Sequence, residues 1–214
     1  MRRLLHLVMS PSCRLVRLAL GEKRVAYELA AADDALAHVP VFFDLDGVAV
    51  TGLWAIVDHL ESEYPDHPLV PADAPARGEA LRLLDWLMGN FHEQTTKRIV
   101  FEKASQAHTG SIMRRPPNMD IVRAGRDALK VNLQRLGSIA ETRGFLAGRD
   151  VSLADLALAA HLSALDYYGE IPWPECPQLT EWYIRIKSRP SFRPLLADRV
   201  PGQPPVPHYA ELDF

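Results

Sequence analysis

Hydrophobic residues change their spacing part of the way along the chain. At first, short apolar runs of strand length alternate with a stretch in which apolar residues recur three or four positions apart. A short apolar run, or an alternation of apolar and polar residues, is typical of a strand. Apolar residues three or four positions apart are typical of a helix. The runs predict, in chain order, a strand at 3–8, a helix through 15–20, a strand at 25–29, a strand that opens at Val39-Pro40, a strand at 48–50 and a helix through 56–60.

The order of these elements defines a small α/β unit. A helix between two strands normally makes a right-handed parallel crossover. Asp46-Gly47 predicts a two-residue turn between the last two strands, because glycine tolerates the positive φ that such turns require. The order strand-helix-strand followed by strand-strand-helix predicts a thioredoxin-like half within residues 1–64.

Beyond residue 75 the strand signal disappears. Prolines crowd the segment 63–75, and a stiff segment that disfavours helix suits a domain boundary. Apolar residues then recur at helical spacing, which predicts a helix bundle. The predicted helical faces lie at 80–91, 122–140, 156–165 and 179–186, with a polar loop at 106–118. We therefore expect an α/β domain at 1–66, an all-helical domain at 74–198 and a proline-rich C-terminal tail at 199–214.

One helix of the second half carries its own start signal. Ser152 and Asp155 have the spacing of a capping box, in which the hydroxyl and the carboxylate each accept a backbone N–H at the helix start. The following residues, 156–165, are apolar on almost every side, so this helix should lie inside the bundle. His161 falls within it, and we interpret it as a core histidine rather than a metal ligand.

Composition excludes several classes of function. The chain has 214 residues, 48% hydrophobic content and a formal net charge of -3, so it lacks the positive field that nucleic acid binding requires. No apolar run reaches the length of a membrane span, and no secretory leader is expected, so we predict a cytoplasmic protein without direct membrane insertion. With only two cysteines, neither a disulfide framework nor a cysteine-rich metal site is expected.

Four stretches of sequence together resemble the glutathione S-transferase superfamily: Ser10-Pro11-Ser12-Cys13, Val39-Pro40, the helix 53–60 and the segment 148–155. The resemblance implies a thioredoxin-like α+β N-terminal domain (βαβ-ββα) followed by an all-helical domain. It also implies a cis peptide bond before Pro40, and a homodimer in which the helix 76–91 takes part.

The residues that would hold glutathione depart from that family. Transferases bind the γ-glutamyl end with an acid and a hydroxyl just before the third helix, and the corresponding positions here are Gly52 and Leu53. Thr51 still offers a hydroxyl nearby, and with Val39 and Pro40 it would form a vestigial ligand site. Only seven residues, 33–39, separate the second strand from Pro40, so the second helix should be shortened.

Two residues are candidates for an activated nucleophile. Ser10 and Cys13 lie where the family places its thiolate-stabilising hydroxyl or its reactive cysteine, and a helix N-terminus can lower the pKa of a thiol. The alternative is that Cys13 is a small buried residue with no catalytic role. Glutathione is expected as a cofactor only if one of these two residues is catalytic, and no metal is expected.

The end of the chain points to a partner protein. Residues 188–199 and the end itself resemble a group of alphaproteobacterial division proteins that share this fold and bind the tubulin-like GTPase FtsZ. Prolines at 201–207 should hold the tail extended, ready to dock. The residues expected to bind the partner are His208, Tyr209, Glu211, Leu212, Asp213 and Phe214. The alternative is that the tail folds back over its own body.

The leading hypothesis is therefore a non-catalytic, homodimeric adaptor. It would be cytoplasmic, be recruited to the division site, bind FtsZ filaments through its tail, and regulate their bundling, curvature and constriction. One rival is a glutathione-dependent transferase or redox enzyme that uses Ser10 or Cys13. A second rival is a structural dimer that binds another macromolecule.

Overall fold

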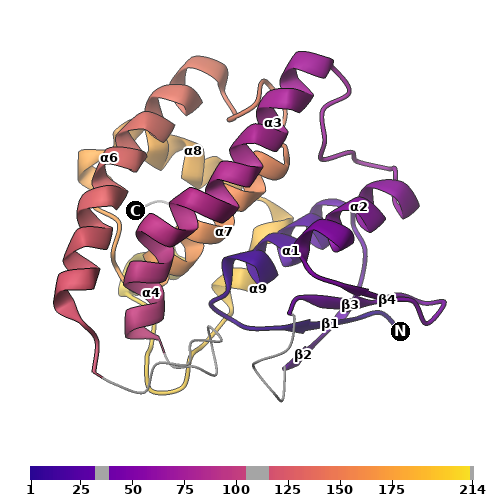
Figure 1. Cartoon of the computed structure of the whole chain (residues 1–214), viewed down its shortest axis with the longest axis horizontal. Helices are drawn as coiled ribbons and strands as arrows, with labels where there is room; N and C mark the ends of the chain where they lie inside the picture. Colours follow the sequence, from indigo (N-terminus) through magenta and orange to yellow (C-terminus); the bar gives the residue numbers. More distant parts are fainter. Residues whose placement is uncertain (32–38, 105–115, 213–214) are drawn as a thin grey trace.

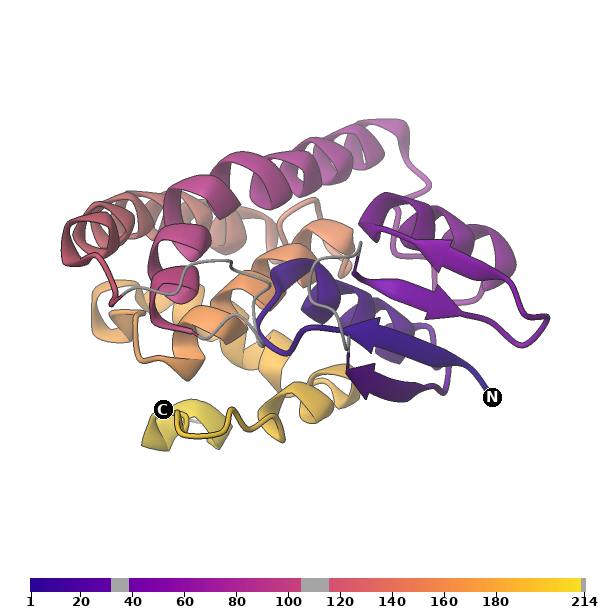
Figure 2. The ribbon, with the colours of Figure 1, turned by 60° about the horizontal axis from the view of Figure 1, so that its bottom comes forward.

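A computed structural model describes residues 1–31, 39–104 and 116–212 of the chain. A small sheet with helices α1 and α2 on one face lies beside a bundle of helices, and the C-terminal segment runs beneath that bundle (Figures 1 and 2). The expected glutathione-transferase type of architecture, an α+β half followed by an all-helical half, is confirmed. The expected short second helix lies in 32–38, outside the described residues.

The bounds of the elements follow the predicted order. The strands are β1 (Arg3–His6), β2 (Glu28–Ala31), β3 (Val41–Phe43) and β4 (Ala49–Thr51). The helices are α1 (Pro11–Glu22), α2 (Leu53–Glu63), α3 (Ala74–Trp86), η1 (Leu87–Thr96), α4 (Lys97–Lys103), α6 (Met119–Arg143), α7 (Leu153–Tyr167), η2 (Trp173–Glu175), α8 (Pro177–Lys187), η3 (Pro190–Phe192), α9 (Arg193–Leu196) and η4 (Pro207–Ala210). The second strand begins three residues later than expected, because 25–27 lead into the sheet rather than pair within it.

The sheet order is β2-β1-β3-β4. The strand β1 pairs in parallel with β2, as expected for a strand-helix-strand crossover, and antiparallel with β3. Leu4 of β1 lies opposite Phe42 of β3, and both side chains are fully buried. The peptide bond between Val39 and Pro40 is cis, which confirms the expectation.

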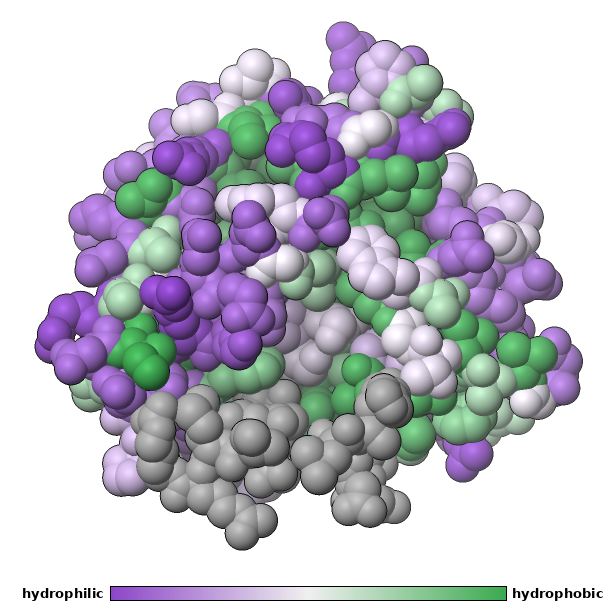
Figure 3. Space-filling model, viewed as in Figure 1, coloured by the Kyte–Doolittle hydropathy of each residue, from purple (hydrophilic) through white to green (hydrophobic). Residues whose placement is uncertain are grey.

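The turn between β3 and β4 is longer than the two residues predicted. Asp44 N donates to Val48 O at 2.9 Å, which leaves three residues, 45–47, in the loop. Gly47 has φ of 82°, the left-handed position that closes three-residue hairpins. Leu45 in this loop is 64% exposed. Figure 3 shows apolar residues gathered at the lower right of the molecule, over the sheet half.

Helices α3, η1 and α4 form one continuous run from Ala74 to Lys103. The middle stretch, η1, is a π-helix, whose turns are wider than those of an α-helix. The predicted apolar face is largely confirmed, because Ala80, Leu84, Leu87 and Phe91 are buried. This run packs against α6 and α7 and forms one wall of the bundle.

The central helix is α7, whose residues Leu153–Tyr167 are all buried. The predicted capping box is present at its start. Asp155 accepts hydrogen bonds from the backbone N–H of Ser152 at 3.0 Å, from that of Leu146 at 2.8 Å and from the indole of Trp182 at 3.1 Å. Nδ1 of His161 shares a hydrogen bond of 2.8 Å with the hydroxyl of Thr96, which agrees with a core histidine.

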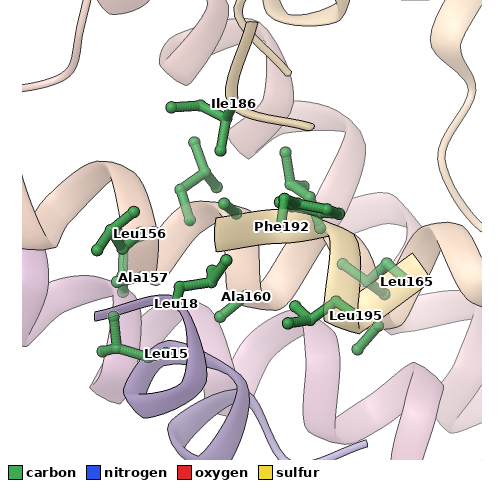
Figure 4. Packing of buried hydrophobic residues seen from close by; sticks show 14 of the residues in the cluster. Leu15, Leu18, Leu156, Ala157, Ala160, Leu165, Ile186, Phe192 and Leu195 are labelled. Atoms are coloured by element: carbon green, nitrogen blue, oxygen red, sulfur yellow. The ribbon is translucent and has the colours of Figure 1, made fainter. Parts of the chain in front are cut away.

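One hydrophobic cluster extends through both halves of the chain. Figure 4 shows Leu15 and Leu18 of α1 close to Leu156, Ala157 and Ala160 of α7. Between the halves, Leu153 N donates to Leu69 O at 2.9 Å, so the proline-rich connection is tied to the bundle. No helix in the part of the chain that the structure describes is long and apolar enough to cross a bilayer.

The C-terminal tail does not project from the body as predicted. Val206 N donates to the carbonyl of Tyr167 at 3.1 Å, and Val200 N donates to the Tyr167 hydroxyl at 2.8 Å. Tyr209 is fully buried. The described part of the tail therefore folds back along the bundle, which was the alternative interpretation of the sequence (Figure 2).

Candidate functional site

The first candidate region lies where β1 leads into α1. Ser10 occupies the position before this helix, is 8% exposed and makes no side-chain cap. Its hydroxyl oxygen lies 3.0 Å from that of Ser12, so the two hydroxyls are paired with each other. Pro11 begins the helix, and its fixed φ favours that position.

Cys13 is fully buried in the first turn of α1. Its sulfur accepts the backbone N–H of Leu7 at 3.4 Å. Burial raises the pKa of this thiol above its ordinary value, which opposes formation of the thiolate. The geometry therefore fits a packing residue better than an activated nucleophile.

The second candidate region is the vestigial ligand site beside Pro40. Gly52 N donates to the Pro40 carbonyl at 2.9 Å, and Gly52 itself has φ of 90°. Leu53 is 8% exposed and points its apolar side chain inward. Thr51 is exposed at the end of β4, and no side chain caps the start of α2. The start of α2 thus offers neither a carboxylate nor a capping hydroxyl to an α-amino acid group.

A buried charge cluster that the sequence analysis missed begins on α1, one residue after Cys13. Arg14 and Arg17 stand three positions apart on α1, and both side chains are almost completely buried. Arg17 donates twice to Asp198, at 2.8 and 2.9 Å, and Arg14 donates to the same carboxylate at 3.1 Å. One carboxylate at the end of the helical half, just before the C-terminal tail, is therefore shared by two arginines of the N-terminal half.

His6 faces this cluster from the end of β1. Its Nδ1 is buried and has no hydrogen-bond partner in the described residues. Burial, followed by the nearby charge of Arg17, lowers the pKa of His6 to about 4. The histidine is therefore neutral at physiological pH, which limits the positive charge enclosed here.

The tail is anchored by Tyr209. Its hydroxyl accepts a hydrogen bond from Arg14 at 3.1 Å and donates to the carbonyl of Leu195 at 2.9 Å. Its ring packs edge-on against Tyr167 with a centroid separation of 5.1 Å. The expectation that Tyr209 is an exposed docking anchor is wrong in this structure, because these contacts take the side chain into the interior.

The neighbours of Tyr209 in the tail divide into bound and exposed residues. His208 Nε2 lies 3.1 Å from the carboxylate of Asp166, and the backbone carbonyl of His208 accepts from Lys187 at 3.4 Å. Glu211 is exposed, and Leu212 is 44% exposed. Asp213 and Phe214, also predicted to bind the partner, lie outside the described residues.

A groove runs beside the end of the tail. Its volume is about 680 Å³, and the described residues that line it are Ile171, Trp173, Pro174, Pro177, Thr180, Glu181, His208 and Glu211. We call it the α8 groove, because α8 supplies one wall and the tail another. A second cleft of about 410 Å³ lies between the end of α1 and Arg189. Neither opens at Ser10, Cys13 or Thr51.

The described residues contain no group of three or more histidine, cysteine, aspartate or glutamate side chains able to hold a metal ion.

Two features combine at the start of α1: a hydroxyl pair and a buried thiol. The C-terminal tail combines a buried anchor with an exposed, acidic and apolar end. The second combination is suited to contact with a macromolecule rather than to chemistry.

The fold and the sequence identify the family. Residues 4–68 match the glutathione S-transferase N-terminal domain, and residues 119–185 match the glutathione S-transferase C-terminal domain. The chain belongs to the glutathione S-transferase family. It is also 37% identical to FtsZ-localized protein A of Caulobacter vibrioides, over 100% of this chain and 98% of that protein.

Solved structures give the same picture. The structure of FzlA from C. crescentus has a TM-score of 0.92 and 37% identity, covering 100% of this chain and 99% of that one. A glutathione S-transferase from Rhodospirillum rubrum F11 has a TM-score of 0.94 and 38% identity, and each chain is covered completely. Both likenesses extend through the C-terminal tail as well as the two family domains.

Proposed function

We propose that this protein is a non-catalytic adaptor that binds FtsZ filaments and regulates their bundling, curvature and constriction at the division site. The observation that carries the proposal is the full-length similarity to FtsZ-localized protein A, which includes the tail. Recruitment of a cytoplasmic protein to the division site follows from binding the filament.

The state of the glutathione region supports a role without catalysis. A hydrogen bond to a charged group stabilises a complex by ~1.5–3 kcal/mol, so two lost contacts at Gly52 and Leu53 weaken tripeptide binding by at least about two orders of magnitude. The Cys13 thiol is enclosed and its pKa is raised by burial. These features remove both the substrate clamp and the reactive thiolate.

The tail supports a role in binding. Tyr209 fixes the chain one residue before the exposed stretch that begins at Ala210. Glu211 and Leu212 then present a carboxylate and an apolar side chain to solvent, and Asp213 and Phe214 continue the same chemistry in sequence. A short segment held at one end loses less entropy when it docks than a free tail does.

A homodimer is part of the proposal. The helix 76–91, which the family resemblance assigns to the dimer interface, carries Leu81 with 44% of its surface exposed. The sheet half also exposes Leu45, Val48 and Trp54. Two tails on one dimer would contact two subunits of a filament or two filaments, and linked sites bind far more tightly than single ones. This arrangement explains how an adaptor bundles a polymer.

Cosedimentation with FtsZ polymerised by GTP tests the proposal. Deleting the last three residues, 212–214, which lie beyond the buried Tyr209, should abolish pelleting, and Leu212→Asp should weaken it at least about tenfold, because a charge replaces the apolar contact. The matched control is Val131→Asp, which alters another exposed apolar residue, on α6 and with 48% of its surface exposed. Equal pelleting of the intact and shortened chains would contradict the proposal.

The alternative function is a glutathione-dependent transferase or redox enzyme that uses Ser10 or Cys13. Membership of the family favours it, as do relatives such as the R. rubrum protein, whose structure carries the name glutathione S-transferase. Retention on glutathione-agarose, together with thiol conjugation that is lost in Ser10→Ala or Cys13→Ala, would establish this alternative. Absence of both, alongside FtsZ pelleting, supports the adaptor.

A further inference from the structure

The α8 groove has the composition of a peptide-binding groove. Ile171, Trp173, Pro174 and Pro177 provide its apolar lining. Trp173 is 6% exposed and is held by a hydrogen bond of 2.9 Å from its indole to Asp166, so its ring is fixed in place. Rigid grooves of aromatic residues and proline suit an extended segment of another chain.

The rim of the groove is acidic. Glu181 on α8 and Glu211 on the tail both line it and are exposed. Among the described residues, none of the ion pairs involves Glu181. Arg185, one turn further along α8, instead donates to the carbonyl of Gly144 at 2.7 Å. The carboxylate of Glu181 therefore remains available to a cation from outside.

We propose that the α8 groove binds an extended segment of the filament protein, in which an apolar or proline side chain enters the groove and an adjacent lysine or arginine pairs with Glu181 and Glu211. This inference rests on the proposed function and assigns it a second contact surface. The acidic rim selects a basic segment over an acidic one. The shared wall places this contact directly beside the exposed end of the tail.

Tyr209 and its neighbour hold in place the wall of the α8 groove that the tail supplies. Tyr209 is held by Arg14 and by the Leu195 carbonyl, and His208 before it contacts Asp166. Both contacts lie within three residues of Glu211. The wall of the groove that belongs to the tail is therefore part of the folded body. A partner segment meets a formed groove, not a loose chain.

Charge reversal at Glu181 tests the proposal. Purified wild type, Glu181→Lys, Glu181→Gln and the control Asp58→Lys, which alters an exposed acid on α2, are titrated against FtsZ polymers at low and moderate salt. The expected result is about a tenfold loss of apparent affinity for Glu181→Lys at low salt, a smaller loss for Glu181→Gln, and none for Asp58→Lys. Added salt should narrow these differences.

The outcomes separate this inference from the proposed function. If wild type pellets with FtsZ and Leu212→Asp does not, but Glu181→Lys binds like wild type, the groove proposal is wrong and the adaptor role stands. If wild type itself does not pellet, the adaptor role is wrong and the groove proposal falls with it. Glu181 is exposed, so Glu181→Lys should keep the wild-type thermal midpoint, and a folded variant that loses binding supports the groove.

Discussion

The hydroxyl of Tyr209 accepts a hydrogen bond from the guanidinium of Arg14 at 3.1 Å, across 195 positions of the chain. Both residues are fully buried. The contact joins the first helix of the α/β half to the last described turn of the protein. The tail is therefore a structural part of the body up to Tyr209, and only the residues beyond it are presented to a partner.

Tyr209→Phe should lower the free energy of unfolding by about 1–3 kcal/mol, because it leaves one N–H of Arg14 buried without its partner. The Leu195 carbonyl loses the same hydroxyl but keeps the backbone N–H of Asp198 at 3.2 Å. Urea unfolding followed by circular dichroism measures the effect. Tyr168→Phe is the control, since the Tyr168 hydroxyl bonds at 3.2 Å to the side chain of Gln203 in a partly exposed position. Equal costs for the two variants would contradict a special role for Tyr209.

Asp198→Asn should be more costly, at about 3–5 kcal/mol, because it leaves the buried charges of Arg14 and Arg17 without a counterion. The side chain of Asp198 is 9% exposed, and those of the arginines are 0% and 1% exposed. Asp120→Asn provides the same chemical change in an ion pair with Arg123 that is almost fully solvated. There the loss should stay within about 1 kcal/mol, as measured by urea unfolding.

Stability should fall as the pH falls from 6.5 toward 4. The pKa of His6 is lowered from 6.5 to about 4 by burial and by Arg17, so the unfolded chain takes up this proton first. Protonation therefore favours the unfolded state within this window, by up to about 3 kcal/mol, and has no effect above it. Thermal midpoints measured between pH 4 and 8 test the sign.

His6→Gln removes this titration and should flatten the profile. Some slope should remain, because burial also lowers the pKa of His92 and of His161. His67→Asn is the control, because His67 is exposed and asparagine tolerates its positive φ of 58°. A profile in which His6→Gln matches wild type would show that His6 does not contribute.

Cys13 should resist alkylation in the folded protein. Its side chain is fully buried and burial raises its pKa, so the thiolate is both scarce and enclosed. In a Cys176→Ala background, iodoacetamide at pH 8 should label Cys13 at least about 100-fold more slowly than in urea. Labelling at the unfolded rate would contradict this structure at α1 and would favour the redox alternative.

Local signals made much of the fold predictable. Ser152 and Asp155 stand three positions apart, so a local sequence pattern is enough to predict their capping contact. The apolar run that follows had to be buried on all sides, and α7 is. The cis Val39-Pro40 bond came instead from the family resemblance, because no local pattern specifies it.

The charge cluster and the path of the tail were not predictable in this way. Arg14 and Arg17 stand at helical spacing among apolar residues, which is the one local hint that they face inward. Their partner Asp198 is 181 positions from Arg17, and no local sequence pattern around Asp198 predicts this ion pair. The prolines suggested an extended arm, but the contacts of Tyr209 with α1 and α7 outweigh that local preference.

The final prediction compares two glycines of α6. A Cβ at Gly125 would lie 2.8 Å from Cγ1 of Ile99 and 2.9 Å from Cβ of Arg98, so Gly125→Ala must push α4 away and should destabilise the fold by about 1–3 kcal/mol. A Cβ at Gly137 would meet its first neighbour, the backbone N of Leu179, at an ordinary 3.6 Å. Gly137→Ala should therefore stabilise the protein by about 0.5–1 kcal/mol, through the better helix propensity of alanine. Urea unfolding of the two variants should show shifts of opposite sign, and shifts of the same sign would contradict the packing of α4 against α6.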